Sequence, residues 1–386
     1  MLFVAALLLA AADTDTQQCA DSASDAADAS SDEAGGCGCG GSTLSRDGAA
    51  PATTTTTTTA TITATTADTT APSATARLIW VPGGEFVMGH DNRSLSPSTF
   101  DADGEGPSRR VAVDGFWMAE TEVSNAQFAA FAAATGHVTD SERFNWSFVF
   151  ERQLTAAANA AATQSVHAAP WWIRVDGASW RAPDGPGSDA LADGRDAHPV
   201  AHVSWTDAAA YCGWAHPAGG RLPTEAEWEL AARGGGEAAQ KRWRYPWGGA
   251  LTPGGAHRAN VWQGKFPLNN TAKDGWAYPA PVRSMEPQNA LGFHHLIGNV
   301  WEWVSDYWTT SHTKPPRGAP PLQNPRGPPR EASTGERAKK GGSYMCHKSY
   351  CFRYRIAARS QNSEDTGTSN LGIRCAASGE SGAAPS

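Results

Sequence analysis

The sequence of 386 residues lacks a hydrophobic run long enough to cross a membrane, and it lacks an excess of basic residues. Residues 1–12 form an apolar run, but a membrane-spanning helix needs about 20 apolar residues. Lys and Arg number 31 against 39 Asp and Glu, which gives a net charge of −8. We therefore expect no membrane span. The mild acidic excess argues against a nucleic-acid-binding protein, because such proteins present basic surfaces.

Long amphipathic helices are also not expected, because glycine and proline are abundant. The chain has 40 Gly, 25 Pro and 16 Trp, and 40% of its residues are hydrophobic. This composition supports a large core but interrupts regular structure often, so it predicts a loop-rich protein. Residues 236–300 and 309–338 are predicted to be mostly loop. The predicted elements are two short strands in 78–89, a strand and then a helix in 109–136, and helices in 202–215 and 223–235.

Local signals mark the ends of the predicted helices. Ser124 is predicted to be a helix N-cap, and Gly136 is predicted to stop the same helix. Thr224 and Glu227 have the spacing of a capping box, in which each side chain bonds the backbone of the other residue. These signals therefore predict where two of the short helices begin.

The N-terminal region cannot build a core. Residues 1–12 are interpreted as a secretory signal peptide, although the usual basic residues are missing; a buried N-terminal segment is the alternative. Residues 13–76 are rich in Thr, Ala, Asp and Ser, and are predicted to be a disordered, low-complexity linker. Cys37 and Cys39 lie in this linker between glycines. They are expected to be exposed, either as a mobile redox pair or as an inert remnant.

The segment GGSYMCHKSYCFRYR contains two of the seven cysteines, Cys346 and Cys351. Spacing alone leaves several types of site open, with a disulfide as the leading interpretation. A zinc site would need more ligands than the adjacent His347 supplies. Two thiolates would instead suit a soft ion of low coordination number, such as Cu(I). Reactive thiolates need positive charge nearby, and we expect Lys348, Arg353 and Arg355 to supply it; a solvated basic face is the alternative.

The chain is similar to one known family through many motifs besides this segment. They are VPGGEFVMG, FWMAETEVSNAQF, SFVFE, APWW, HPVAHVSW, AAYCGWA, RLPTEAEWE, YPWG, NVWQGKFPLNNT, DGW, GNVWEWVSDYW and LGIRCA. Their order resembles that of formylglycine-generating enzymes, the sulfatase-modifying factors, over residues 78–377. The CGCG at 37–40 also resembles the N-terminal cysteine pair of the members from the endoplasmic reticulum.

The resemblance implies an irregular α/β fold related to C-type lectins, with little regular secondary structure. It implies a single catalytic domain at 77–377, followed by a polar tail at 378–386. The implied activity is oxidation of one cysteine of a nascent sulfatase, within a Cys-x-Pro-x-Arg motif, to Cα-formylglycine by O2 and a thiol reductant. The implied location is the lumen of the endoplasmic reticulum. We expect a monomer or weak dimer, with redox or retention partners reached through Cys37 and Cys39.

The same resemblance implies a set of site residues. Cys346 and Cys351 would hold Cu(I) as a two-thiolate site, to which the substrate cysteine adds a third sulfur. Ser343 would position the sulfur or oxygen of the substrate. Five further residues would line the substrate cleft: Trp171, Trp172, His347, Tyr350 and Asn370.

Two calcium sites follow from the resemblance. The first would consist of Asn260, the carbonyl of Val261, Asp274 and the carbonyl of Trp276. Such oxygen ligands suit a hard cation. The second would consist of His295, the carbonyls of Gly298 and Val300, and the carboxylate of Glu302. Because His295 stands where the family has Asn, and imidazole is a poor calcium ligand, we expect the second site to be weaker or absent.

The resemblance also pairs Cys212 with Cys375 in a disulfide. A second bridge of the family falls on Ala232 and Ile356, so both of its cysteines are missing together, and we expect these two residues to be neighbours.

Two other functions are alternatives. One is a catalytically silent, lectin-like or regulatory paralogue that binds sulfatases, although such paralogues lack the Cys346 pair. The other is an iron-dependent sulfur-transfer enzyme, which would need a histidine cluster that the sequence lacks.

Overall fold

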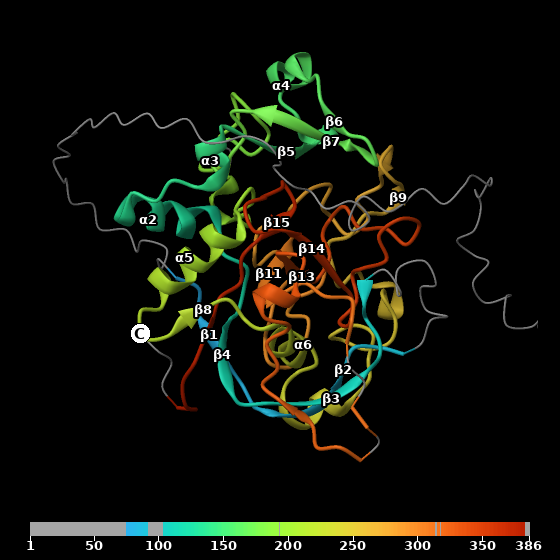
Figure 1. Ribbon diagram of the computed structural model, residues 1–386. Coiled ribbons are helices and arrows are strands. Elements are labelled where there is room, and N and C mark those ends of the chain that lie inside the picture. Colours follow the sequence, from blue (N-terminus) through green and yellow to red (C-terminus); the bar gives the residue numbers. More distant parts are fainter. Residues whose placement is uncertain (1–74, 92–102, 193, 313–314, 317, 383–386) are drawn as a thin grey trace, which may run out of the picture. The chain divides into compact units, whose positions relative to one another are not determined.

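Short strands and short helices make up the regular structure, as the glycine and proline content predicts (Figure 1). The computed structural model describes residues 75–91, 103–192, 194–312, 315–316 and 318–382. Among these residues the longest helices, α2 (Asn125–Thr135) and α5 (Trp205–Ala215), have 11 residues each, and the longest strand, β7 (Ala169–Asp176), has 8. The predicted signal peptide and most of the predicted linker, with Cys37 and Cys39, lie outside the described residues.

Side-chain caps start the helices where the sequence predicts them. The Ser124 hydroxyl accepts a hydrogen bond from a backbone N–H in the first turn of α2, and Gly136 ends that helix with a φ of 68°. At α6 (Glu225–Ala232), Thr224 and Glu227 form the predicted capping box. These predictions are confirmed, and each cap stabilises its helix by about 1 kcal/mol. The other described α-helices are α3 (Asp140–Phe144) and α4 (Ala156–Ala161).

One four-stranded antiparallel sheet joins strands from the beginning and the end of the described chain. Its order is β1 (Leu78–Val81), β4 (Phe116–Ala119), β16 (Ala376–Ala377) and β8 (Gly220–Arg221). A disulfide links Cys212 of α5 to Cys375, which directly precedes β16, with their Cα atoms 5.4 Å apart. The pair implied by the family resemblance is therefore the pair that is bonded in the structure, and it ties α5 to this sheet.

A second four-stranded sheet carries the segments that form the candidate site. Its order is β14 (Arg359–Ser363), β13 (Glu336–Lys340), β11 (Trp301–Tyr307) and β15 (Leu371–Gly372). β13 is antiparallel to both of its neighbours, and β15 is parallel to β11. Ser343 lies shortly after β13, and Asn370 directly precedes β15. Two strands of one sheet thus deliver two of the predicted site residues.

Three smaller sheets complete the described strands. They are β12 (Leu322–Gln323), β3 (Arg109–Val113) and β2 (Gly84–Met88); β5 (Trp146–Phe150), β7 and β6 (Ser165–Val166); and β10 (Asn269–Asn270) with β9 (Gly264–Lys265). The prediction of a loop over 309–338 was wrong in part, because this range contains β12 and the start of β13. β12 pairs in parallel with β3, which lies far earlier in the sequence. So short a strand has no sequence pattern of its own.

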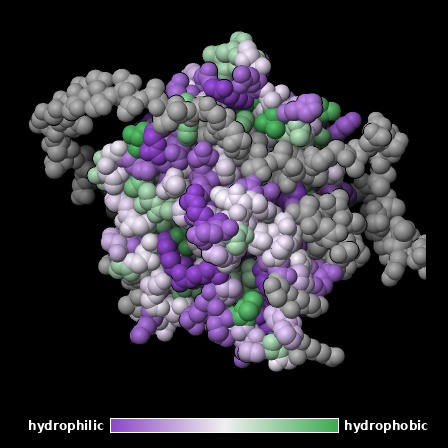
Figure 2. All heavy atoms as spheres, in the orientation of Figure 1, coloured by the Kyte–Doolittle hydropathy of each residue, from purple (hydrophilic) through white to green (hydrophobic). Residues whose placement is uncertain are grey.

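Aromatic side chains dominate the core. The largest fully buried residues include five tryptophans: Trp172, Trp180, Trp228, Trp301 and Trp303. Ala232 and Ile356 are both buried in the main hydrophobic cluster, where the resemblance implies a missing bridge. On the face shown in Figure 2, hydrophobic described residues appear only in small, separate areas. Within the described segments, no helix combines the length and hydrophobicity needed to cross a bilayer.

Candidate active site around Cys346 and Cys351

A tight turn after β13 positions Ser343 and Cys346. Gly341 and Gly342 begin it with φ angles of 95° and 76°, a region that favours glycine. A Cβ atom on Gly341 would lie 2.6 Å from the carbonyl oxygen of Leu296, so a side chain cannot be accommodated there. The turn closes where the Cys346 N–H donates to the Ser343 carbonyl at 2.9 Å. Ser343 and Cys346 are therefore fixed on one turn.

The Cys346 sulfur faces polar groups of Ser343. The backbone N–H of Ser343 donates to Cys346 Sγ at 3.4 Å, and Ser343 Oγ lies 4.0 Å from the same sulfur. Asn370 Nδ2 donates to Ser343 Oγ at 2.9 Å. All three residues are fully buried or nearly so. The structure therefore brings together three of the predicted site residues, and the backbone N–H that points at the sulfur favours its thiolate form.

A helical turn returns the chain from Cys346 to Cys351. The Cys351 N–H donates to the carbonyl of His347 at 2.8 Å. Cys346 and Cys351 are both fully buried and lie outside the disulfide. Burial raises the pKa of Tyr354 well above its ordinary value, and negative charge on Tyr245 and on both cysteines raises that pKa further. Cys346, Cys351 and Tyr354 all belong to the main hydrophobic cluster, so the two thiols share a buried environment.

Aromatic rings pack beside this turn. Phe266 stacks on Tyr350 with ring centroids 3.8 Å apart, and Trp171 approaches these two rings edge-on at 5.0 and 5.5 Å. Trp172 is instead fully buried in the adjoining hydrophobic cluster. The structure thus brings Trp171 and Tyr350 together and places Trp172 in the core. Sequence reasoning missed Phe266, although this residue lies within the NVWQGKFPLNNT motif used for the resemblance.

His347 makes its described polar contact within its own turn. Its Nδ1 lies 2.8 Å from Ser349 Oγ, and the ring is half-buried. Burial, and then the charge of Lys348, lower the pKa of His347. The imidazole is therefore mainly neutral at pH 7.

Buried ion pairs anchor the chain that follows Cys351. Arg353 pairs with Asp103 and Arg355 with Glu105, each with a nitrogen–oxygen distance of 2.6 Å. We expected these two arginines to provide positive charge for the thiolates. The structure corrects this expectation, because their charge is balanced by carboxylates that lie 250 residues earlier in the sequence.

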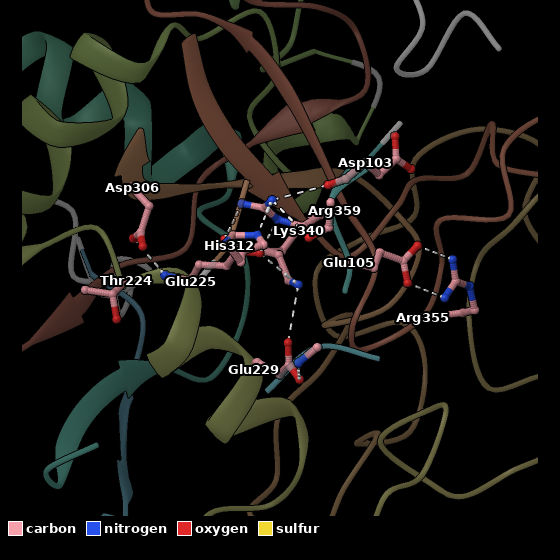
Figure 3. A network of polar contacts seen from close by, with 12 residues as sticks. Asp103, Glu105, Thr224, Glu225, Glu229, Asp306, His312, Lys340, Arg355 and Arg359 are labelled. Carbon is pink, nitrogen blue, oxygen red and sulfur yellow. Dashed lines mark hydrogen bonds and ion pairs between the residues drawn. The ribbon is translucent and has the colours of Figure 1, made fainter. Parts of the chain in front are cut away.

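The same network continues into α6 and β14 (Figure 3). Arg359 and Lys340 contact Glu225 at 2.8 and 3.4 Å. Burial raises the pKa of Glu225, but these two cations lower it by more and hold it well below its usual range. Sequence reasoning missed this network because its members come from segments that lie far apart in the sequence (Figure 3).

The residues of the first predicted calcium site come together. The Asp274 carboxylate accepts hydrogen bonds from the N–H groups of Val261 and Trp276 at 3.1 and 3.0 Å. Burial raises the pKa of Asp274. The side-chain oxygen of Asn260 is buried, and no hydrogen-bond partner for it is found among the described residues. The amide oxygen of Asn260 and the half-buried carboxylate of Asp274 are oxygen ligands of the kind that calcium binds.

The residues of the second predicted calcium site, His295, Gly298, Val300 and Glu302, do not fit that ion. Arg374 contacts Glu302 at 2.6 Å with both side chains fully buried, and the Trp228 indole N–H donates to the same carboxylate at 2.6 Å. Burial, and then the charge of Arg374, lower the pKa of His295 to about 3, so its imidazole is neutral. A guanidinium therefore already balances the carboxylate that calcium would need.

The donor set at the cysteine pair fits a soft ion. Within the described ranges, no group of three or more His, Cys, Asp or Glu side chains is arranged to hold a metal. A zinc site usually has three or four such ligands, whereas Cu(I) accepts two thiolates. Cys346 and Cys351 together fit Cu(I) better than they fit zinc.

Known proteins resemble the chain over most of its length. The family model described as "Sulfatase-modifying factor enzyme 1-like domain" matches residues 63–378. A mouse protein named formylglycine-generating enzyme is 49% identical over 346 residues, which are 89% of this chain and 86% of that protein. A cow protein named inactive C-alpha-formylglycine-generating enzyme 2 is 39% identical over 304 residues, 78% of this chain and 88% of the relative.

A solved structure shares the fold. The structure of PvdO from Pseudomonas aeruginosa superposes with a TM-score of 0.52 and 20% identity, and covers 79% of this chain and 95% of PvdO. The observed architecture is accordingly a mixed α/β fold of this type with few helices. The family match spans nearly all described residues, including both cysteines of the candidate site. The chain belongs to the sulfatase-modifying factor enzyme 1-like family.

Proposed function

We propose that this protein oxidises the cysteine of a Cys-x-Pro-x-Arg sequence in sulfatases to Cα-formylglycine, with O2 and a thiol reductant. The observation that carries the proposal is that Cys346 and Cys351 are both buried, with Cys346 beside Ser343. The chain is also more similar to an active relative than to an inactive one. An inactive, sulfatase-binding paralogue is the alternative function that the experiment below can reveal.

Cys346 and Cys351 are the residues that would hold Cu(I), which supplies the one-electron chemistry with O2 that protein side chains lack. The N–H of Ser343 donates to Cys346 Sγ, and thereby favours the deprotonated sulfur that a metal ligand requires. Full burial of both cysteines keeps water away from them. The chain's own contribution is thus to hold two thiolates in a dry, polar-lined turn.

The aromatic rings beside the turn would receive the substrate peptide. The indole N–H of Trp171 is buried, and it has no hydrogen-bond partner among the described residues. A buried donor without a partner costs about 1–3 kcal/mol, so a peptide carbonyl that accepts from this N–H would relieve that cost. Tyr350 and Phe266 would add apolar contact.

The proposal has further parts that follow from the family resemblance. Calcium would occupy the Asn260 and Asp274 site, where the donor set supports it, and would bind poorly near Glu302. The protein would act on nascent sulfatases in the endoplasmic reticulum, with Cys37 and Cys39 serving redox or retention partners. The fold would be related to that of C-type lectins, and the protein would be a monomer or weak dimer.

The proposal is tested with purified protein, Cu(I), O2, a thiol reductant and a peptide that contains Cys-x-Pro-x-Arg. We expect mass spectrometry to show a product lighter by about 18 Da, because oxygen replaces sulfur and two hydrogens are lost. A peptide with serine in place of cysteine should not react, since a hydroxyl does not replace a thiolate as a ligand. Binding of the peptide without any aldehyde would favour the inactive paralogue instead.

A further inference from the structure

We propose that Thr368 is a positioning residue of this site: it orients the Asn370 side-chain amide so that the Ser343 hydroxyl donates its hydrogen to the Cys346 sulfur. The inference rests on the proposed function only where it concerns turnover. The hydrogen-bond geometry that supports it is independent of the reaction. Thr368 is fully buried and was not among the residues that the family resemblance assigns.

The hydroxyl hydrogen of Ser343 has one acceptor left among the described residues. Its Oγ accepts from Asn370 Nδ2 at 2.9 Å and from the N–H of Met345 at 3.4 Å. A hydroxyl has two lone pairs and one hydrogen, so both lone pairs are used. Cys346 Sγ lies 4.0 Å from the same oxygen and already accepts the Ser343 backbone N–H. The hydroxyl therefore acts as a second donor to that sulfur.

The direction of this donation depends on which end of the Asn370 amide faces Ser343. Thr368 Oγ1 donates to Asn370 Oδ1 at 2.8 Å, which leaves the NH2 end directed at Ser343. If the amide rotated by half a turn, its oxygen would take the Ser343 hydrogen, and the sulfur would lose a donor. Because all of these groups are buried, water does not replace the missing partner.

The main chain around Thr368 is fixed independently of its side chain. The Thr368 carbonyl accepts from the His202 N–H at 3.0 Å, and the residue forms a parallel bridge with Phe148 of β5. The next residue, Ser369, donates its N–H to the Phe148 carbonyl at 3.1 Å. Replacing the hydroxyl of Thr368 with a methyl group should thus change the amide orientation and leave the backbone in place.

The test compares Thr368→Val with Thr368→Ser and with the matched control Thr366→Val. Thr366 is also a buried threonine of the same segment, but its hydroxyl bonds Ser363 and Asp365. Thr368→Val should lower kcat of the Cu(I)-loaded enzyme about five-fold and leave KM unchanged. A change of this size corresponds to the net free energy of one hydrogen bond. Thr368→Ser should restore wild-type kcat, and Thr366→Val should leave it unchanged.

A double-mutant cycle separates positioning from general damage. In a Ser343→Ala background, Thr368→Val should cause no further loss of kcat, because the hydroxyl that it orients is gone. The proposal would be overturned if the losses of kcat caused by Thr368→Val and Ser343→Ala multiplied in the double variant. Equal kcat values for Thr368→Val and Thr366→Val would overturn it as well.

An NMR measurement that needs neither metal nor turnover tests the orientation of the Asn370 amide independently of the proposed function. In metal-free protein labelled with 15N-asparagine, the side-chain amide signal of Asn370 is identified by its loss in Asn370→Asp. We expect Thr368→Val to shift this signal and Thr366→Val to leave it in place; an unshifted signal would refute the proposal. If wild-type protein yields no aldehyde, the proposed function fails, while this signal still decides whether Thr368 orients the amide.

Discussion

Arg355 and Glu105 form a fully buried ion pair, with 2.6 Å between guanidinium nitrogen and carboxylate oxygen, although 250 residues separate them in the sequence. Glu105→Gln would leave the guanidinium buried without its counter-charge. We expect this variant to lower the free energy of unfolding by about 3–5 kcal/mol. Urea unfolding of the purified variant measures this change.

A surface pair provides the matched control for that variant. Glu85 contacts Arg110 at 2.7 Å, but about half of each side chain is exposed, at 51% and 56%. Glu85→Gln should therefore cost less than about 1 kcal/mol. Equal losses of stability in the two variants would show that burial does not matter at Arg355.

The Cys212–Cys375 disulfide should be a large contributor to stability. It joins residues 163 positions apart, and the chain-entropy estimate for a loop of this length is about 5 kcal/mol. We expect the Cys212→Ala, Cys375→Ala double variant to lose stability by up to this amount in denaturant unfolding under non-reducing conditions. Peptide mapping without reduction should recover the linked pair from wild-type protein, and finding both thiols alkylated would contradict the bridge.

Calcium should bind at one site. Asp274 offers a half-buried carboxylate and Asn260 a side-chain oxygen without a described partner, whereas Glu302 is already paired with Arg374. Isothermal titration of metal-free protein with calcium should give one site per chain, and Asp274→Asn should abolish it. His295→Asn should add no second site, because Arg374 still occupies the carboxylate. Two sites of equal affinity in wild-type protein would be incompatible with this arrangement.

Asp306 should make stability depend on pH. Burial, and then the charge of Glu225, raise the pKa of Asp306 from 3.8 to about 7. Between pH 4 and 7 the folded protein therefore binds more protons at Asp306 than the unfolded chain does, so the free energy of unfolding falls as pH rises through this window. The slope from this group is at most about 1.4 kcal/mol per pH unit.

The variant Asp306→Asn isolates that contribution. It does not titrate, and its amide oxygen can still accept the Glu225 N–H that Asp306 accepts at 2.9 Å. Urea unfolding between pH 5 and 7 should give a flatter profile for the variant than for the wild type. Parallel profiles would mean that Asp306 is ionised throughout this range.

Local sequence patterns predicted local structure well. The caps at Ser124 and Thr224 and the stop at Gly136 depend on residues within one turn of each other, and all were found. The β12 strand was missed because its existence depends on pairing with β3, more than half of the chain away. Short strands in a glycine-rich chain are defined by tertiary contacts, which no local pattern contains.

The residues of the candidate site were likewise predictable where one motif contains them, and not where they meet across the fold. Cys346, Cys351 and Ser343 lie in one motif and were recognisable together, and the resemblance added Asn370. The charge partners of Arg353 and Arg355 could not be predicted, since opposite charges pair across the fold without any sequence signal. Arg374 was also missed at the second calcium site, although it adjoins Cys375 in the LGIRC motif, because nothing in that motif indicates which carboxylate it meets.

The central claim is that Cys346 and Cys351 act together as the reactive centre. The most direct measurement is the yield of aldehyde from a Cys-x-Pro-x-Arg peptide, compared between Cu(I)-loaded wild-type protein, Cys346→Ser and Cys351→Ser, together with the copper bound per chain. We predict one copper and conversion by the wild type, and loss of both in each variant, because a single thiolate does not hold Cu(I) in a two-coordinate site. Conversion by either variant at the wild-type rate would contradict the claim.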